Sequence, residues 1–324
     1  MKAVICKTLG GPETLVVEDI PALKAGPGQI VIDVKAAGVN FPDLLIMQGK
    51  YQFKAPLPFS PGAEASGIVK SLGEGVTGFK PGDAVIAHMI WGAFAQEAVI
   101  EAKNATCMPA GMDFNVAAGF TVTYATSYHG LKDRAKLKKG ETLLVLGAAG
   151  GVGLAAVELG KLMGARVIAA ASSDGKLATC KRFGADVLIN YETQDLREAI
   201  RAATDGRGVD VVYDPVGGKY SEPALRSLKW KGRHLVVGFA AGDIPKIPLN
   251  LALLKGCSIV GVFWGGFSRN EPKKDVANIA QLAAWIVEGK LKPMVSTTYP
   301  LARAGDALAD LAARRVQGKA VLVV

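Results

Sequence analysis

The sequence predicts an α/β protein in which a doubly wound parallel sheet is joined to a smaller β-rich module. Three observations support this prediction. Strand-like and helix-like stretches alternate from about residue 123 to residue 262. Short β runs separated by Gly and Pro fill the chain up to about residue 122. With 324 residues, the chain is longer than one ordinary domain and suits two.

The stretch from Glu141 to Asp174 carries the strongest βαβ signal. Residues 143–146 are all apolar and stop at Gly147, as expected of a strand that is buried on both faces. From Val152 the apolar residues recur with helical spacing, and a second apolar run follows over residues 167–171. The glycines of the first turn therefore begin a helix whose N-terminus can bind a pyrophosphate.

The glycine fingerprint of this turn is imperfect. Ala148, Gly150 and Gly153 take the three small positions in one register, and Gly151, Gly153 and Ala156 take them in another. Neither is a clean GxGxxG, but the strand before the turn and the helix and strand after it are the context that a dinucleotide site requires.

The end of the second strand predicts which dinucleotide is bound. It reads Ala171, Ser172, Ser173, with no carboxylate to bind the ribose 2′-hydroxyl of NADH. Asp174 comes later, where we expect it to cap the next helix. Because Ser172, Ser173 and Lys176 suit a 2′-phosphate, the sequence favours NADPH over NADH.

Composition excludes several classes of protein. Apolar residues make up 50% and charged residues 21% of the chain, which is typical of a globular protein. No apolar stretch could span a bilayer and the N-terminus lacks an apolar h-region, so we expect a cytoplasmic protein without membrane contact. The 4 cysteines form no CxxC pair. The net charge of +9 is scattered, which favours a solvated surface over nucleic-acid binding.

Further elements are predicted along the chain. The β runs up to residue 122 indicate an irregular barrel. After the opening unit, strands are expected over 187–190, 209–217, 234–239 and 258–263, and helices over 194–203 and 220–228. Six strands complete a doubly wound Rossmann sheet.

The last segment contains a long helix ending near Gly289, a β-like stretch, a helix over 304–316 and a final strand. Such a fragment cannot form its own core, so we expect it to return to the barrel. The predicted parts are therefore residues 1–122, 123–262 and 263–324.

Several motifs in order carry a resemblance that covers the whole chain. They are GVNFPDLL (38–45), QGKY (48–51), PGAEASGIV (61–69), TSYHGL (126–131), GAAGGVG (147–153), YDPVGG (213–218) and VGFAAG (237–242). The chain resembles the medium-chain dehydrogenase/reductase superfamily, and within it the zinc-independent, zeta-crystallin-like quinone oxidoreductases. The resemblance implies a GroES-like β-barrel catalytic domain, a Rossmann domain, an active site between them and a homodimer paired near residues 258–263.

The zinc alcohol dehydrogenases of this superfamily hold their metal with a cysteine, a histidine and a third cysteine or carboxylate. This chain has Asn40, Ala63 and Val122 at the matching positions, and none is an ordinary zinc ligand. We therefore expect no metal. Without a Lewis acid, the favoured hydride acceptor is one that is already electrophilic, such as a quinone or an α,β-unsaturated carbonyl. With quinones, transfer of single electrons is the alternative, and the sequence does not decide between the two. The developing oxyanion then needs only hydrogen-bond donors.

The resemblance implies catalytic roles for Asn40, Asp43 and Tyr51. The amide of Asn40 would orient the substrate or nicotinamide, Asp43 would support Asn40, and the Tyr51 hydroxyl would protonate or steady the oxyanion. Each also has a structural alternative: a loop bond, a structural carboxylate and a packed tyrosine. Glu64 is interpreted as structural, whereas His129 is left open as a substrate contact.

The resemblance also implies a set of cofactor contacts. The glycine turn would bind the pyrophosphate, the ends of the second and third strands together with a C-terminal arginine would bind the 2′-phosphate, and the remaining residues would lie near the nicotinamide. The candidates are Thr126, Tyr128, Ala149, Gly150, Gly151, Val152, Ser172, Ser173, Lys176, Tyr191, Val237, Gly238, Phe239, Phe263, Trp264 and Arg314.

The predicted activity is therefore NADPH-dependent reduction of a small-molecule quinone or conjugated carbonyl. Two alternatives stay open. An enoyl-thioester reductase would use the same machinery but would need a cationic groove for its carrier arm. A noncatalytic NADPH-binding protein, of the crystallin-like or RNA-binding kind, would bind the cofactor without turnover.

Overall fold

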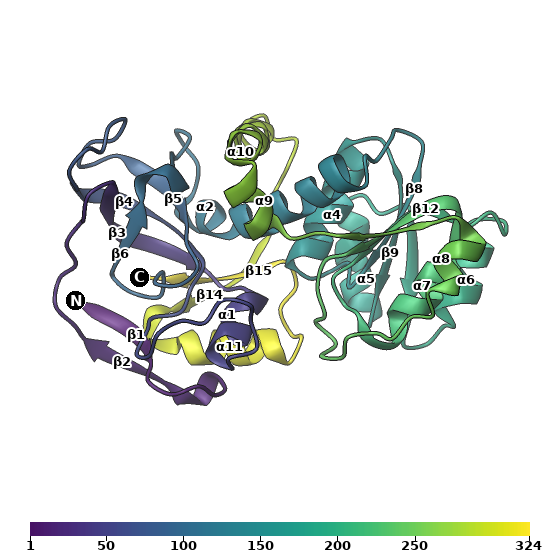
Figure 1. Cartoon of the computed structure of the whole chain (residues 1–324), viewed down its shortest axis with the longest axis horizontal. Coiled ribbons are helices and arrows are strands. Elements are labelled where there is room, and N and C mark those ends of the chain that lie inside the picture. The colour runs from purple at the N-terminus through teal and green to yellow at the C-terminus, as the bar shows by residue number, and fades with distance from the viewer. The chain divides into compact units, whose positions relative to one another are not determined.

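The computed structural model describes all 324 residues and divides into two compact units. Unit 1 comprises Met1–Val122 and Pro293–Val324, and unit 2 comprises Thr123–Lys292. The chain therefore leaves unit 1, builds unit 2 without interruption and returns. Both termini lie in unit 1 (Figure 1).

Unit 2 is built on a six-stranded sheet in the order β10-β9-β8-β11-β12-β13. All neighbouring strands run parallel. The order reverses between β8 and β11, which is the switch point of a doubly wound sheet. This confirms the predicted Rossmann sheet. The strands are β8 (Thr142–Leu146), β9 (Arg166–Ala171), β10 (Val187–Asn190), β11 (Val209–Asp214), β12 (Leu228–Val236) and β13 (Ser258–Gly261).

Helices cover both faces of this sheet. Two pack against β8, β9 and β10, whereas the other three pack along β10, β11 and β12. Figure 1 shows the two groups on opposite sides. All residues of β11 are buried, as expected of a central strand in a parallel sheet. The helices are α4 (Gly151–Leu162), α5 (Asp174–Arg182), α6 (Leu196–Ala203), α7 (Ser221–Arg226) and α8 (Asn250–Lys255).

An irregular helical stretch precedes the sheet. A π-helical turn, Thr121–Ala125, leads from α2 (Phe114–Phe120) to α3 (Thr126–Tyr128). A second π-helical turn, His129–Arg134, follows. Such turns widen a helix locally and are frequent at functional sites.

The segment after residue 263 differs from its predicted assignment. We expected all of 263–324 to return to the barrel, but α9 (Trp264–Asn270) and α10 (Pro272–Val287) belong to unit 2. A partly buried polar contact ties α10 to that unit: Asn278 on α10 donates to Asp133. Only the chain from Pro293 onward joins unit 1.

Unit 1 contains a seven-stranded sheet with the path β14-β15-β3-β4-β5-β7, and β6 pairs with β3. A separate ribbon joins β1 and β2. The strands of unit 1 are β1 (Lys2–Cys6), β2 (Leu15–Asp19), β3 (Gln29–Gly38), β4 (Glu64–Leu72), β5 (Ala84–His88), β6 (Glu97–Glu101), β7 (Ala105–Cys107), β14 (Val295–Pro300) and β15 (Lys319–Val323).

The end of the chain completes unit 1. β15 pairs antiparallel with β3, so that Val321 lies opposite Gly38. The helix α11 (Ala304–Ala312) contacts α1 (Phe41–Met47), and Figure 1 shows the yellow α11 beside the purple α1. The loop that follows β3 is thereby fixed by residues almost 280 positions later in the sequence.

Candidate functional site

The turn between β8 and α4 has the close packing that a dinucleotide-binding turn requires. Gly147 has a φ of 57°, and a Cβ on Gly153 would lie 2.3 Å from the Gly147 carbonyl oxygen. Gly150 is the N-cap of α4. The backbone N–H groups of Gly151 and Val152 in the first helical turn have no intrahelical acceptors. They suit the oxygens of a pyrophosphate.

The candidate 2′-phosphate residues of unit 2 come together at neighbouring strand ends. Lys176 Nζ donates to Ser172 Oγ at 3.0 Å. Tyr191, which follows β10, donates its backbone N–H to Ala171 at the end of β9 over 3.2 Å. Because β9 and β10 are parallel neighbours, their carboxyl ends place these side chains at one edge of the sheet. An ammonium and a hydroxyl in contact fit an anionic group.

Ser173, not Asp174, caps α5. Its hydroxyl oxygen accepts from the backbone N–H of Lys176 at 3.4 Å, so the expected capping role of Asp174 is wrong. Asp174 is the first residue inside the helix, and its carboxylate accepts from Asn190 Nδ2 at 2.8 Å. This acid is thus bound to an amide on β10, which leaves Ser172 and Lys176 as the polar pair at the end of β9.

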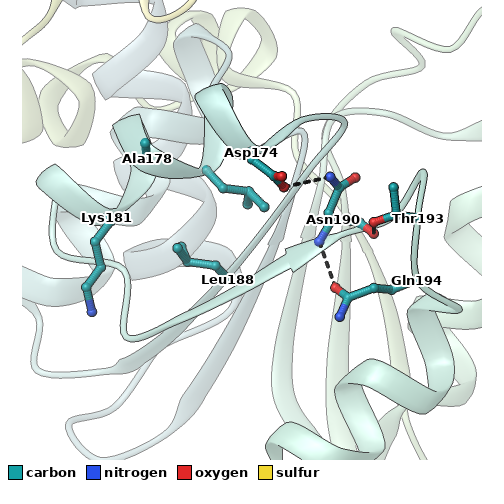
Figure 2. A pocket seen from close by; sticks show the side chains of 8 residues that line it. Asp174, Ala178, Lys181, Leu188, Asn190, Thr193 and Gln194 are labelled. Atoms are coloured by element: carbon teal, nitrogen blue, oxygen red, sulfur yellow. Dashed lines mark hydrogen bonds between the residues drawn. The ribbon is translucent and has the colours of Figure 1, made fainter.

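A shallow pocket of about 560 Å³ lies beside this cluster, on an adjoining stripe of α5 (Figure 2). α5, β10 and the turn after β10 line it. None of the candidate cofactor residues is part of its wall. The lining residues are Asp174, Leu177, Ala178, Lys181, Leu188, Asn190, Thr193 and Gln194.

Ser127 connects α3 to the pyrophosphate turn, a role that the sequence interpretation missed. Its hydroxyl donates to the Val152 carbonyl at 2.9 Å and lies 2.8 Å from the Tyr213 hydroxyl. Its neighbours Thr126 and Tyr128 were the named candidates. The Tyr128 ring packs edge-on against Trp285, with centroids 5.3 Å apart. The buried serine inside TSYHGL was the available signal.

The candidate nicotinamide residues after β12 and β13 divide into two kinds. Val237 continues β12 by donating its N–H to the Asp214 carbonyl at 2.9 Å, and Gly238 and Phe239 follow it. Trp264 is buried, and its indole N–H donates to Asp275 at 2.7 Å, so this tryptophan packs α9 against α10. Phe263, by contrast, is exposed.

In unit 1, Asn40 lies in a buried polar cluster centred on Lys319. The Lys319 ammonium donates to the Val39 carbonyl at 2.9 Å, to Asn40 Oδ1 at 2.7 Å and to Glu64 Oε1 at 2.8 Å. Lys319 is 5% exposed and Glu64 is 0% exposed. All three ammonium hydrogens are therefore used inside the protein.

The amide of Asn40 is equally committed. Its Nδ2 donates to the Gly38 carbonyl at 3.2 Å and to Glu64 Oε1 at 2.9 Å. Glu64 also accepts the Val122 N–H at 2.8 Å. Because both amide hydrogens have acceptors here, the geometry favours the structural alternative for Asn40, in which it fixes the loop after β3.

Asp43 is the second buried acid of this cluster. Its carboxylate accepts the backbone N–H of Asn40 at 2.8 Å. Burial raises its pKa to about 7, although the Asn40 N–H and the Lys319 charge both oppose that shift. His88 lies opposite Glu64 in the pairing of β4 with β5, and burial lowers its pKa to about 4.

Tyr51 and Arg314 are the remaining candidates of unit 1. Tyr51 is half-buried in the loop after α1, where its ring packs edge-on against Phe53 at 5.8 Å and against the barrel core. Arg314 follows α11 with a φ of 58°.

The side chains form no group of three or more His, Cys, Asp or Glu that could hold a metal ion. At the positions that match the zinc ligands, Asn40 contributes an amide already bonded to Glu64, and Val122 contributes only its backbone N–H. No helix combines the length and the apolar character needed to span a bilayer.

Comparisons with known proteins agree with this architecture. The alcohol dehydrogenase GroES-like domain family matches residues 26–133, and the zinc-binding dehydrogenase family matches residues 151–282. Quinone oxidoreductase-like protein 2 of Bos taurus is 36% identical over 99% of this chain and 92% of its own length. Quinone oxidoreductase of Rattus norvegicus is 33% identical over 96% of this chain and 94% of its own length.

A solved structure matches equally well. The quinone oxidoreductase of Escherichia coli, crystallised with NADPH, has a TM-score of 0.94 and 30% identity, and each chain is covered over 100% of its length. The likeness extends across both units and over the motifs named above. The chain therefore belongs to the medium-chain dehydrogenase/reductase superfamily, in its zinc-independent quinone oxidoreductase branch.

Proposed function

We propose that this protein is an NADPH-dependent oxidoreductase that reduces quinones or related α,β-unsaturated carbonyls without a metal. The observation that carries the choice of cofactor is the Lys176–Ser172 contact at the end of β9, where an acid would favour NADH. Relatives named quinone oxidoreductases, one of them solved with NADPH, support the same choice.

The chain's own residues would bind and orient the cofactor. The turn from Gly147 to Gly153 receives the pyrophosphate. Gly153 allows the close packing of this turn, since a side chain there would collide with the Gly147 carbonyl. Lys176 and Ser172 neutralise and hydrogen-bond the 2′-phosphate. When bound, NADPH supplies the hydride. Tyr51 is our candidate for hydrogen bonding the reduced acceptor, whereas the Asn40 amide holds its loop.

We also propose a homodimer in which β13 of one copy faces β13 of another. β13 is an edge strand of the sheet, and Ile259 on it is 41% exposed. The nearby helix α8 exposes Leu253 and Leu254. An uncovered edge with apolar side chains is suited to pairing with a second chain.

The 4 cysteines are free thiols, in keeping with a reducing cytoplasm.

The test is NADPH oxidation measured with panels of quinones, enones and enoyl thioesters. We expect turnover with quinones, and a reduced rate for Tyr51→Phe, which removes the hydroxyl while keeping the ring. Preference for enoyl thioesters would move the assignment to that acceptor class. NADPH binding without turnover on any panel would contradict the proposed activity and support a noncatalytic role.

A further inference from the structure

Unit 2 contains a histidine whose ring is fixed from two sides. His129 lies in the π-helical turn after α3, and its Nδ1 is 3.0 Å from Asp133 Oδ2. Phe267 of α9 stacks on the imidazole, with centroids 4.0 Å apart and planes inclined by 19°. The residue is 5% exposed. These two contacts fix both the position and the tilt of the imidazole ring.

The carboxylate partner is itself held in place. Asn278 Nδ2 donates to the same Asp133 oxygen at 2.9 Å, and Lys132 Nζ donates to Asn278 Oδ1 at 2.6 Å. Two further charges face this group from α10, the carboxylate of Asp275 and the ammonium of Lys274. A held carboxylate on Nδ1 fixes the orientation of an imidazole and leaves Nε2 as its other nitrogen.

A second His–Asp pair shows by contrast what is particular to His129. His234 is 1% exposed, its Nε2 lies 3.2 Å from Asp214 Oδ2, and its Nδ1 is buried without a partner. Nε2 of His129, unlike Nδ1 of His234, is not a fully buried atom that lacks a hydrogen-bond partner. Because Asp133 occupies Nδ1, the nitrogen left for an external ligand is Nε2.

The sequence position of His129 links it to the proposed reaction. His129 follows Thr126 by three residues, and residues at that spacing share one face of a helix. The family resemblance places Thr126 on the nicotinamide side of the cofactor. The π-helical turn at His129–Arg134 is also of a kind that recurs at functional sites.

We propose that His129, oriented by Asp133, is the general acid of the reduction. This assignment rests on the proposed function. Hydride transfer from NADPH to a quinone carries two electrons and leaves NADP⁺ and a hydroquinone anion. The Nε2–H bond of the imidazolium then breaks as its proton forms an O–H bond on that anion. Hydroquinone and neutral His129 result, and solvent returns a proton to the ring.

The test uses His129→Asn with a series of benzoquinones whose hydroquinone anions differ in basicity. The asparagine amide nitrogen replaces Nδ1 and keeps the Asp133 bond, but nothing replaces Nε2. We expect kcat to fall by about 100-fold for methylated quinones, whose reduced anions are strongly basic, and by only about 2-fold for chlorinated ones. Asp133→Asn should show the same trend with a smaller amplitude.

A second readout is independent of turnover. In imidazole-labelled, NADP⁺-saturated protein, the ¹⁵N signal of His129 Nε2 should shift when 4-methoxyphenol, an inert analogue of a hydroquinone, is added. The Nε2 signal of the fully buried His234 serves as the internal control and should stay in place. The chain has only 3 histidines, so the signals can be assigned by substitution.

The outcomes separate this assignment from the activity itself. A loss of equal size for every quinone, or an unmoved His129 signal, would show that the residue is structural and overturn the general-acid role while leaving the reductase intact. A wild-type protein that reduces none of the quinones would overturn the proposed function, and the general-acid role with it.

Discussion

Lys319 shows how much a single side chain organises in unit 1. It joins the last strand to Val39, Asn40 and Glu64, and it neutralises a glutamate that has no access to water. A buried ion pair of this kind gives little net stability compared with an apolar pair, but removing one partner leaves an uncompensated charge in the interior.

We therefore predict that Lys319→Met lowers the free energy of unfolding by about 3–5 kcal/mol. The double variant Glu64→Gln with Lys319→Met should recover most of that loss, because neither charge remains. Urea unfolding of the wild type, both single variants and the double variant measures the coupling. Lys2→Met, which removes an exposed ion pair with Asp19, is the matched control and should change little. Additive effects of the two substitutions would contradict the pairing.

Asp43 predicts a pH dependence of stability with an unusual sign for an acid. Its pKa is raised by burial to about 7 from the ordinary value of 3.8. Between these values the folded protein binds more protons than the unfolded chain, so the contribution of Asp43 to stability falls as pH rises through this window. The difference in unfolding free energy between wild type and Asp43→Asn should decrease from pH 4 to pH 7.

A second group with a shifted pKa, His88, lies in the same unit. His88, with its pKa lowered to about 4 from 6.5, loses stability in the opposite direction, as pH falls. Because the wild type and Asp43→Asn both retain His88, its effect cancels in the difference between their free energies of unfolding. A difference that stays constant across the window would mean that Asp43 is ionised throughout.

Individual contacts were only partly predictable from the sequence. Ser172, Lys176 and Tyr191 could be grouped because each follows one of two neighbouring parallel strands. Lys319 could not be linked to Glu64, because the pair spans 255 positions and depends on the antiparallel register of β15 with β3. The bond from the Asn40 amide to Glu64 was not predictable either, because it depends on the antiparallel register of β3 with β4.

At the scale of elements, α5 presents two lysines to different surroundings. Lys176 contacts Ser172 at the end of β9, whereas Lys181 lies on the stripe that borders the pocket (Figure 2). The same short helix therefore provides a candidate 2′-phosphate position and a matched control.

We predict that Lys176→Ala raises the Kd for NADPH by about 10- to 100-fold, the range expected for one lost charge-assisted hydrogen bond, and leaves the Kd for NADH nearly unchanged. Lys181→Ala should affect neither. Fluorescence titration with the two cofactors measures both constants. An unaltered preference between NADPH and NADH in Lys176→Ala would show that the 2′-phosphate lies elsewhere.

The strands of unit 2 were predictable because each combines an apolar run with a glycine-bearing or polar end. The final helices were harder. Trp264 of α9 bonds to Asp275 of α10, and Asn278 of α10 bonds to Asp133 of unit 2. Hydrophobic periodicity carries no information on such pairs, so the expected return to the barrel was placed 30 residues too early, at residue 263 instead of Pro293.

At the scale of the whole molecule, the exposed edge of β13 predicts self-association. Ile259→Lys should convert a dimer to a monomer, because a charge on a paired edge must be desolvated. Sedimentation velocity measures the mass. Val16→Lys, which changes a residue with 40% exposure on β2 of unit 1, is the control and should leave the dimer unchanged. A wild type that sediments as a monomer would refute the proposed pairing.

The return of the chain to unit 1 has a consequence for biosynthesis. Unit 2 is continuous in sequence, so it can fold without any residue after Lys292. The barrel has to wait, since β14, β15 and the ammonium that neutralises Glu64 are among the last residues to emerge. The fold of unit 2 is thus independent of these residues, whereas that of unit 1 is incomplete without them.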